Sequence, residues 1–141
     1  MKRARKERSK LIFILGGAAS GKSQVALDLA GPRGPRAFVA TGQALDREMK
    51  ARIERHRATR SSDWETAEVP ADLAKWFSEN KHVYQVVVLD CLTLWLSNLL
   101  GHRLNDLAIS DATADLLRAI RATTARVVIV SNELGLGRYP R

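Results

Sequence analysis

A glycine-rich segment near the start of the sequence matches the phosphate-binding loop pattern G-x-x-x-x-G-K-[ST]. The segment consists of Gly16, Gly17, Ala18, Ala19, Ser20, Gly21, Lys22 and Ser23. Its glycines let backbone N–H groups turn inward around a phosphate, and a helix that begins near Lys22 presents its positive dipole end to the anion. Lys22 would contact the outer phosphates, and the Ser23 hydroxyl would bind Mg²⁺. The pattern predicts a nucleotide site; the alternative is a glycine-rich turn between a strand and a helix.

Asp90 directly follows an apolar run, residues 86–89, that is typical of a buried strand. In phosphate-loop enzymes an aspartate at the end of such a strand helps to hold magnesium. The alternative is that Asp90 caps a helix over residues 92–100. Because a phosphate loop is present in the same chain, we favour Asp90 as the second magnesium residue.

Charged and titratable side chains recur at intervals of four in a segment of helical periodicity, residues 45–60: Glu48, Arg52, His56 and Arg60. This spacing places them along one stripe of a helix, with the imidazole between two guanidinium groups. Nearby cations disfavour the imidazolium, and a neutral imidazole keeps a lone pair that can attack phosphorus. His56 is therefore a candidate nucleophile toward a nucleotide phosphate. The alternative is a solvated helix face with ion pairs.

The chain has 141 residues and a mass of 15.6 kDa, which fits one compact domain. Its 45% hydrophobic and 27% charged residues exclude a disordered or fibrous chain. Every apolar run falls short of the roughly 18 residues that a membrane-spanning helix needs. Cys91 is the only cysteine, so an internal disulfide and a cysteine cluster for zinc are excluded. We therefore expect a reducing compartment, the cytoplasm.

The net charge of +8 is concentrated at the start of the chain. Six of the first ten residues are Lys or Arg and one is acidic, so residues 1–10 carry +5. We expect residues 1–10 to form a basic flexible arm and residues 11–141 to form a single phosphate-loop α/β domain. Contact of the arm with nucleic acid is the alternative, which we do not favour.

Short apolar runs alternate with helical periodicity along the rest of the sequence. Strands are predicted at residues 11–15, 37–40, 64–69, 84–89 and 127–130, the first of them buried on both faces. Helices are predicted at residues 22–30, 45–60, 71–80 and 92–100, the last stopped by Gly101, and a further helix is predicted to be capped by Ser110. This alternation predicts an α/β fold, a mostly parallel sheet with helices on both faces. The polar residues at 16–23, 90 and 131–133 are then expected to converge at the carboxyl edge of the sheet.

Four blocks of the sequence, in this order, resemble the bifunctional adenosylcobinamide kinase / adenosylcobinamide-phosphate guanylyltransferase family of cobalamin biosynthesis. The first is the phosphate loop. The second comprises Ala40, Thr41, Asp46, Glu48, Met49, Arg52, Ile53, His56, Arg60, Trp64, Thr66 and Glu68. The third is the continuous run 90–98, and the fourth is 131–137 together with Pro140. The second and third blocks are far more specific than a phosphate loop alone.

The resemblance implies a RecA-like phosphate-loop NTPase fold and a homotrimer. It implies that ATP or GTP phosphorylates the aminopropanol hydroxyl of adenosylcobinamide. It also implies that a histidine attacks the α-phosphate of GTP, releases pyrophosphate, and passes GMP to adenosylcobinamide phosphate. The position that matches this histidine is His56, which the charge stripe singles out independently.

The resemblance also implies which residues form the site. The residues at 16–23 would cradle the triphosphate, with Lys22 taking part in catalysis. Ser23 and Asp90 would serve magnesium. The guanine nucleotide site would be lined by Thr41, Gly42, Gln43, Arg57, Ala58, Thr59, Arg60 and Glu68.

The sequence departs from the family pattern in three places. Ala19 stands where the family usually has an arginine, which bears on the kinase step. Arg138 and Tyr139 precede Pro140 where the family often has Ile-Val. Family members also continue for several tens of residues with a helix and a further strand, so this chain is short at its C-terminal end, and the sheet is expected to have an unpaired edge.

Two other functions stay open on the residues alone. One is a phosphate-loop kinase or NTPase with an unrelated acceptor, and the other is a truncated, inactive nucleotide-binding module whose arm contacts nucleic acid. For Trp95, within the third block, a core or subunit-interface position is favoured over a contact with the corrinoid.

Overall fold

The computed structural model describes residues 10–16, 21–42, 64–102 and 104–132. Its strands are β1 (Leu11–Gly16), β2 (Arg36–Ala40), β3 (Trp64–Glu68), β4 (Val86–Asp90) and β5 (Arg126–Asn132). Its helices are α1 (Lys22–Ala30), α3 (Leu73–Glu79), α4 (Leu92–Gly101) and α5 (Asp106–Ala122). The five strands form one sheet in the order β1-β5-β4-β2-β3, and every pairing is parallel.

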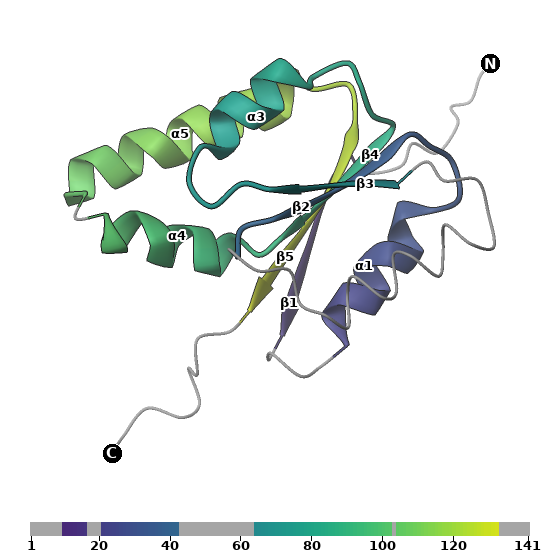
Figure 1. Cartoon of the computed structure of the whole chain (residues 1–141), viewed down its shortest axis with the longest axis horizontal. Helices are drawn as coiled ribbons and strands as arrows, with labels where there is room; N and C mark the ends of the chain where they lie inside the picture. Colours follow the sequence, from purple (N-terminus) through teal and green to yellow (C-terminus); the bar gives the residue numbers. More distant parts are fainter. Residues whose placement is uncertain (1–9, 17–20, 43–63, 103, 133–141) are drawn as a thin grey trace, which may run out of the picture.

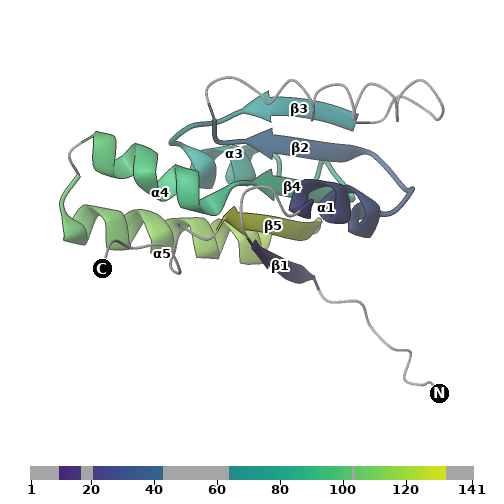
Figure 2. The same ribbon diagram turned by 90° about the horizontal axis from the view of Figure 1, so that it is seen from below.

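Helices cover both faces of this sheet, as Figures 1 and 2 show. Helix α1 packs on one face, and α3, α4 and α5 lie on the other. Successive residues of a strand point to opposite faces, so β4 supplies Val86 and Val88 to the core under α1 and Val87 and Leu89 to the core under the other helices. Because both faces are covered, the central strands are continuous apolar runs. The predicted α/β fold is confirmed.

The expectation that the first strand is buried on both faces is wrong. β1 lies at the edge of the sheet and pairs only with β5 among the described strands. Ile12 and Ile14 pack against the core under α1. Leu11, Phe13 and Leu15 point to the opposite face, where 37%, 50% and 69% of their surface is exposed.

Three helix boundaries differ from the predicted ones. α5 begins at Asp106 rather than at a Ser110 cap, because the Asn105 side chain accepts a hydrogen bond from the Ala108 N–H at 2.8 Å. α4 includes Gly101 as its last residue instead of stopping before it. α3 begins at Leu73, two residues after the predicted start. The helix predicted at residues 45–60 and the basic arm at 1–9 lie outside the described residues.

None of the helices that the structure describes is both long enough and apolar enough to cross a membrane.

Candidate active site

The carboxyl edge of the sheet gathers the residues that the motifs singled out. The register pairs Gly16 with Asn132 at the ends of β1 and β5. Ala40 of β2 lies between Asp90 of β4 and Glu68 of β3. The convergence predicted for the strand ends is therefore confirmed for the described residues.

Helix α1 begins at this edge. Gly21 precedes it with φ of 80°, in the left-handed region, which favours a residue without a Cβ. Lys22 is the first residue of the helix and is only 6% exposed. The described part of the structure does not include the side chain of Ser23 or the loop positions Gly17, Ala18, Ala19 and Ser20.

Asp90 is the last residue of β4 and is partly buried. Its backbone carbonyl accepts a hydrogen bond from the Thr41 N–H at 3.0 Å. The alternative that Asp90 caps the following helix is wrong. The cap is Cys91, whose Sγ accepts from the Leu94 N–H at 3.3 Å.

Thr41 follows β2 and is fully buried. Its Oγ1 donates to the carbonyl oxygen of Cys91 at 2.7 Å and accepts from the Cys91 N–H at 2.9 Å. The hydroxyl of Thr41 thus holds the residue that directly follows Asp90 at both its N–H and its carbonyl. Thr41 and Gly42 were predicted to line the guanine site, and the structure places both at the carboxyl edge.

Glu68 ends β3 and is exposed at the same edge. The next N–H, of Val69, donates to the carbonyl of Ala40 at 2.8 Å, which continues the pairing of β2 and β3 by one residue. Pro70 and Ala71 then lead into α3.

Helix α4 ties these strand ends together through its side chains. Asn98 Nδ2 donates to the carbonyl oxygens of Thr41, at 3.0 Å, and Pro70, at 2.9 Å. Trp95 Nε1 donates to the carbonyl of Ala71 at 2.8 Å, while its ring is 2% exposed in the core under α3, α4 and α5. The core position favoured for Trp95 is confirmed.

The other strand end joined to α4 is that of β5. Thr93 Oγ1 and Ser131 Oγ are 2.6 Å apart and share a hydrogen bond. The contacts of Thr93, Asn98 and Ser131 were not foreseen. The available signal was the presence of polar side chains in an otherwise apolar helix, since such groups need partners when they are buried.

Several predicted site residues lie outside the described part of the chain, so their positions are not assigned: Gly17, Ala18, Ala19, Ser20, Gln43, His56, Arg57, Ala58, Thr59 and Arg60.

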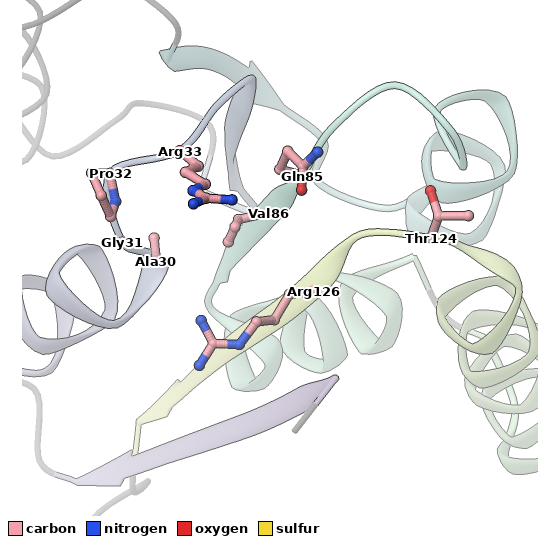
Figure 3. A pocket seen from close by; sticks show the side chains of 8 residues that line it. All are labelled: Ala30, Gly31, Pro32, Arg33, Gln85, Val86, Thr124 and Arg126. Atoms are coloured by element: carbon pink, nitrogen blue, oxygen red, sulfur yellow. The ribbon is translucent and has the colours of Figure 1, made fainter. Parts of the chain in front are cut away.

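A cavity of about 680 Å³ lies at the amino edge, the opposite edge of the sheet. As Figure 3 shows, it is bounded by the turn after α1 and by the amino-terminal ends of β4 and β5. The lining residues are Ala30, Gly31, Pro32, Arg33, Gln85, Val86, Thr124 and Arg126. None of them belongs to the predicted site.

Magnesium can be tested against the donors at the carboxyl edge. In the described ranges, no three His, Cys, Asp or Glu side chains cluster closely enough to hold a metal ion. Mg²⁺ does not require such a cluster, because it commonly binds through one or two carboxylates, substrate phosphates and water. The single carboxylate of Asp90 fits that mode.

Comparisons with known proteins identify the family of this chain. The model of the family described as cobinamide kinase / cobinamide phosphate guanyltransferase matches residues 12–141. The bifunctional adenosylcobalamin biosynthesis protein CobP of Pseudomonas aeruginosa is 43% identical over 130 residues, which cover 91% of this chain and 74% of that protein. Bifunctional CobU proteins of Escherichia coli and Salmonella typhimurium are 35% and 34% identical, over 92% of this chain and 78% of each relative. This chain therefore belongs to the cobinamide kinase / cobinamide phosphate guanyltransferase family.

Proposed function

We propose that this chain activates cobinamide for cobalamin biosynthesis in two nucleotide-dependent reactions. The first phosphorylates adenosylcobinamide, and the second transfers GMP from GTP to adenosylcobinamide phosphate. The observation that carries the proposal is the family match over residues 12–141, because that span includes the phosphate loop, His56 and the strand ends. The relatives, named as bifunctional adenosylcobalamin biosynthesis proteins, support a role in cobalamin biosynthesis with two activities.

The triphosphate would lie at the carboxyl edge, where α1 begins. Backbone N–H groups of the first helical turn and the Lys22 ammonium would face the phosphates. Gly42, Gln43 and Glu68, with residues 57–60, would contact the guanine nucleotide. Thr41, which was predicted with them, is fully buried and would lie behind this surface. Glu68 and Asp90 end the strands on either side of β2, and Gly42 follows shortly after the end of β2, so all three lie at one edge, which supports this assignment.

Ser23 and Asp90 would hold Mg²⁺ together with the phosphates. The ion would supply positive charge that neutralises the phosphate oxygens as the leaving group departs. Asp90 is suited to this role because its backbone is fixed from β2, through the hydrogen bond from the Thr41 N–H.

His56 would be the nucleophile of the transfer reaction. A neutral ring nitrogen attacks the α-phosphorus of GTP, a P–N bond forms, and the bond to the bridging oxygen breaks with its electron pair leaving on pyrophosphate. A phosphate oxygen of adenosylcobinamide phosphate then attacks the same phosphorus and releases the histidine. Arg52, Arg60 and Arg57 would keep the imidazole neutral and hold the phosphates.

The kinase reaction would use the same phosphate loop with ATP or GTP as donor. Ala19 removes a cation that the family usually carries in this loop, so we expect the kinase reaction to be the slower of the two. We also propose that the chain acts as a homotrimer in the cytoplasm.

The test is a product assay with purified protein and Mg²⁺. Adenosylcobinamide with ATP or GTP should yield its phosphate, and adenosylcobinamide phosphate with GTP should yield adenosylcobinamide-GDP and pyrophosphate. Nucleotide hydrolysis without either product would favour a phosphate-loop enzyme with another acceptor. Salt-sensitive DNA binding without any turnover would favour an inactive module whose basic arm contacts nucleic acid.

A further inference from the structure

We infer that Thr41 and Asn98 are positioning residues of this site, which lock together the ends of β2, β3 and β4. The inference rests on the proposed function, because it concerns the strand ends that carry Glu68 and Asp90. It gives a role to the run 90–98, one of the two blocks that are far more specific than the phosphate loop, to which the proposed reactions assign only Asp90.

The amide of Asn98 joins two loops that are distant in sequence. Its Nδ2 bonds are made to Thr41 O, just after β2, and to Pro70 O, just after β3. An amide nitrogen carries two protons, and this geometry uses both. A carboxylate has no donor and would face two carbonyl oxygens, so aspartate cannot replace asparagine here.

The hydroxyl of Thr41 joins the same loop to β4. As donor it reaches the carbonyl of Cys91, and as acceptor it takes the Cys91 N–H. The backbone N–H of Thr41 adds a bond to the carbonyl of Asp90. Asp90 and Cys91 are thus held through three hydrogen bonds from one residue of the neighbouring strand end.

The helix that presents Asn98 is itself fixed. Trp95, one turn before Asn98, is buried and bonded to Ala71 O, and Leu99 is buried beside it in the core. Groups held on a rigid helix can place a site more precisely than groups on loops alone. A continuous set of contacts therefore connects the core, through α4, to the strand ends that carry Glu68 and Asp90.

These hydrogen bonds fix where the strand ends lie and contribute little to the packing of the core, because they link loops that follow the paired strands. Misplacing a reacting group by about 1 Å can cost roughly 100-fold in rate. Loosening this network should therefore slow the chemical step more than it weakens binding of GTP, whose triphosphate would be held by α1 and the phosphate loop.

The first test compares Asn98→Asp with Ser97→Asp. Ser97 is exposed on the same helix, so its variant adds the same charge without touching the network. The readouts are the first-order rate constant of protein labelling by α-phosphate-labelled GTP at saturation and the equilibrium affinity for GTP. We expect Asn98→Asp to lower the rate constant by about 10- to 100-fold, with GTP affinity changed less than about threefold. Ser97→Asp should behave as the parent protein.

The second test uses Thr41→Val and Thr41→Ser. Valine keeps the shape but removes the hydroxyl, and serine restores it. We expect the labelling rate constant to fall about tenfold or more in Thr41→Val and to return to within about threefold in Thr41→Ser. Amide hydrogen exchange at Cys91 should quicken in the valine variant alone, because that N–H loses its acceptor.

The outcomes distinguish failure of the positioning role from failure of the proposed function. Parent protein that takes label, with unchanged rate constants in Asn98→Asp and Thr41→Val, would overturn the positioning role and leave the proposed function intact. Variants that lose GTP affinity and folded structure in the same proportion as rate would also overturn it, in favour of a purely structural role. Parent protein that binds GTP but takes no label would overturn both.

Discussion

Basic side chains lie at both ends of helix α1, Lys22 of the helix itself at one end and arginines of β2 and β5 at the other, and the two ends differ in the contacts that these cations make. At its C-terminal end, Arg126 Nη1 donates to Leu29 O at 2.7 Å and Arg36 Nη1 donates to Gly31 O at 2.6 Å. These contacts satisfy carbonyls that a helix leaves unpaired, where the dipole favours positive charge. At its N-terminal end, Lys22 is buried where the dipole disfavours a cation.

The two ends of α1 thus give their cations different roles. The arginines at the amino edge bond carbonyl oxygens at the end of α1 without any ligand, although Arg126 also lines the cavity of Figure 3. A buried lysine at the positive end of a helix suits the phosphate site of the proposed function. Under that proposal the carboxyl edge is the chemical edge, and the arginine contacts at the amino edge are structural.

The largest expected contrast is between Lys22→Ala and Arg126→Ala. Removing Lys22 should weaken GTP binding by roughly 100-fold, since a charge-assisted contact with phosphate contributes about 2–3 kcal/mol. Removing Arg126 should leave GTP affinity within about twofold. Isothermal titration of each variant with Mg²⁺ and GTP measures both. Equal losses in the two variants would erase the distinction between the edges.

A moderate effect is expected from Arg36→Met, and on stability alone. Arg36 is 3% exposed, and its guanidinium lies 4.8 Å from the centre of the Trp64 ring while it bonds Gly31 O. Methionine keeps much of the volume but loses the hydrogen bond and the cation–π contact, which should cost about 1–3 kcal/mol of unfolding free energy. Denaturant unfolding gives the cost, and a matching loss of GTP affinity in the folded protein would contradict a structural role.

The smallest effect concerns pH at the amino edge. The Tyr84 hydroxyl donates to Glu65 Oε1 at 2.5 Å. Burial, with the hydrogen bond and charge of Glu65, raises the pKa of Tyr84 to about 12 from its ordinary 10.0. The neutral phenol is favoured by folding, so this contribution is present in full below pH 10 and is lost as pH rises through about 12.

Ultraviolet titration of tyrosinate checks this pKa. In Glu65→Gln the pKa of Tyr84 should move back toward its ordinary value, while GTP affinity at neutral pH should not change. A titration curve unaffected by Glu65→Gln would show that Glu65 does not hold the phenol proton.

The sequence predicted the arrangement of residues at the carboxyl edge of the sheet better than the arrangement elsewhere. Apolar runs such as 86–89 identify central parallel strands, and the parallel sheet then brings Asp90 and Glu68 to one edge with no further information. Helix α1 followed from local pattern alone. For these residues the local signals and the fold agree.

What the sequence did not reveal depends on pairings between distant segments. β1 resembles a central strand in composition, but the strand order places it at an edge, so Phe13 is half exposed. The role of Asn98 requires Thr41 O and Pro70 O to meet beside it, which no local pattern encodes. The start of α5 moved because the Asn105 side chain caps this helix instead of Ser110, whereas α3 begins after Asp72, whose side chain makes no capping hydrogen bond.

Covalent labelling tests the central claim, guanylyl transfer through His56, most directly. The protein is incubated with Mg²⁺ and GTP labelled at the α-phosphate, then denatured, and label retained on the chain is measured. We predict acid-labile label that is absent in His56→Ala, although that variant still binds GTP, and present in His82→Ala, the matched control at an exposed histidine. Full labelling of His56→Ala, or parent protein that binds GTP and retains no label, would contradict the account.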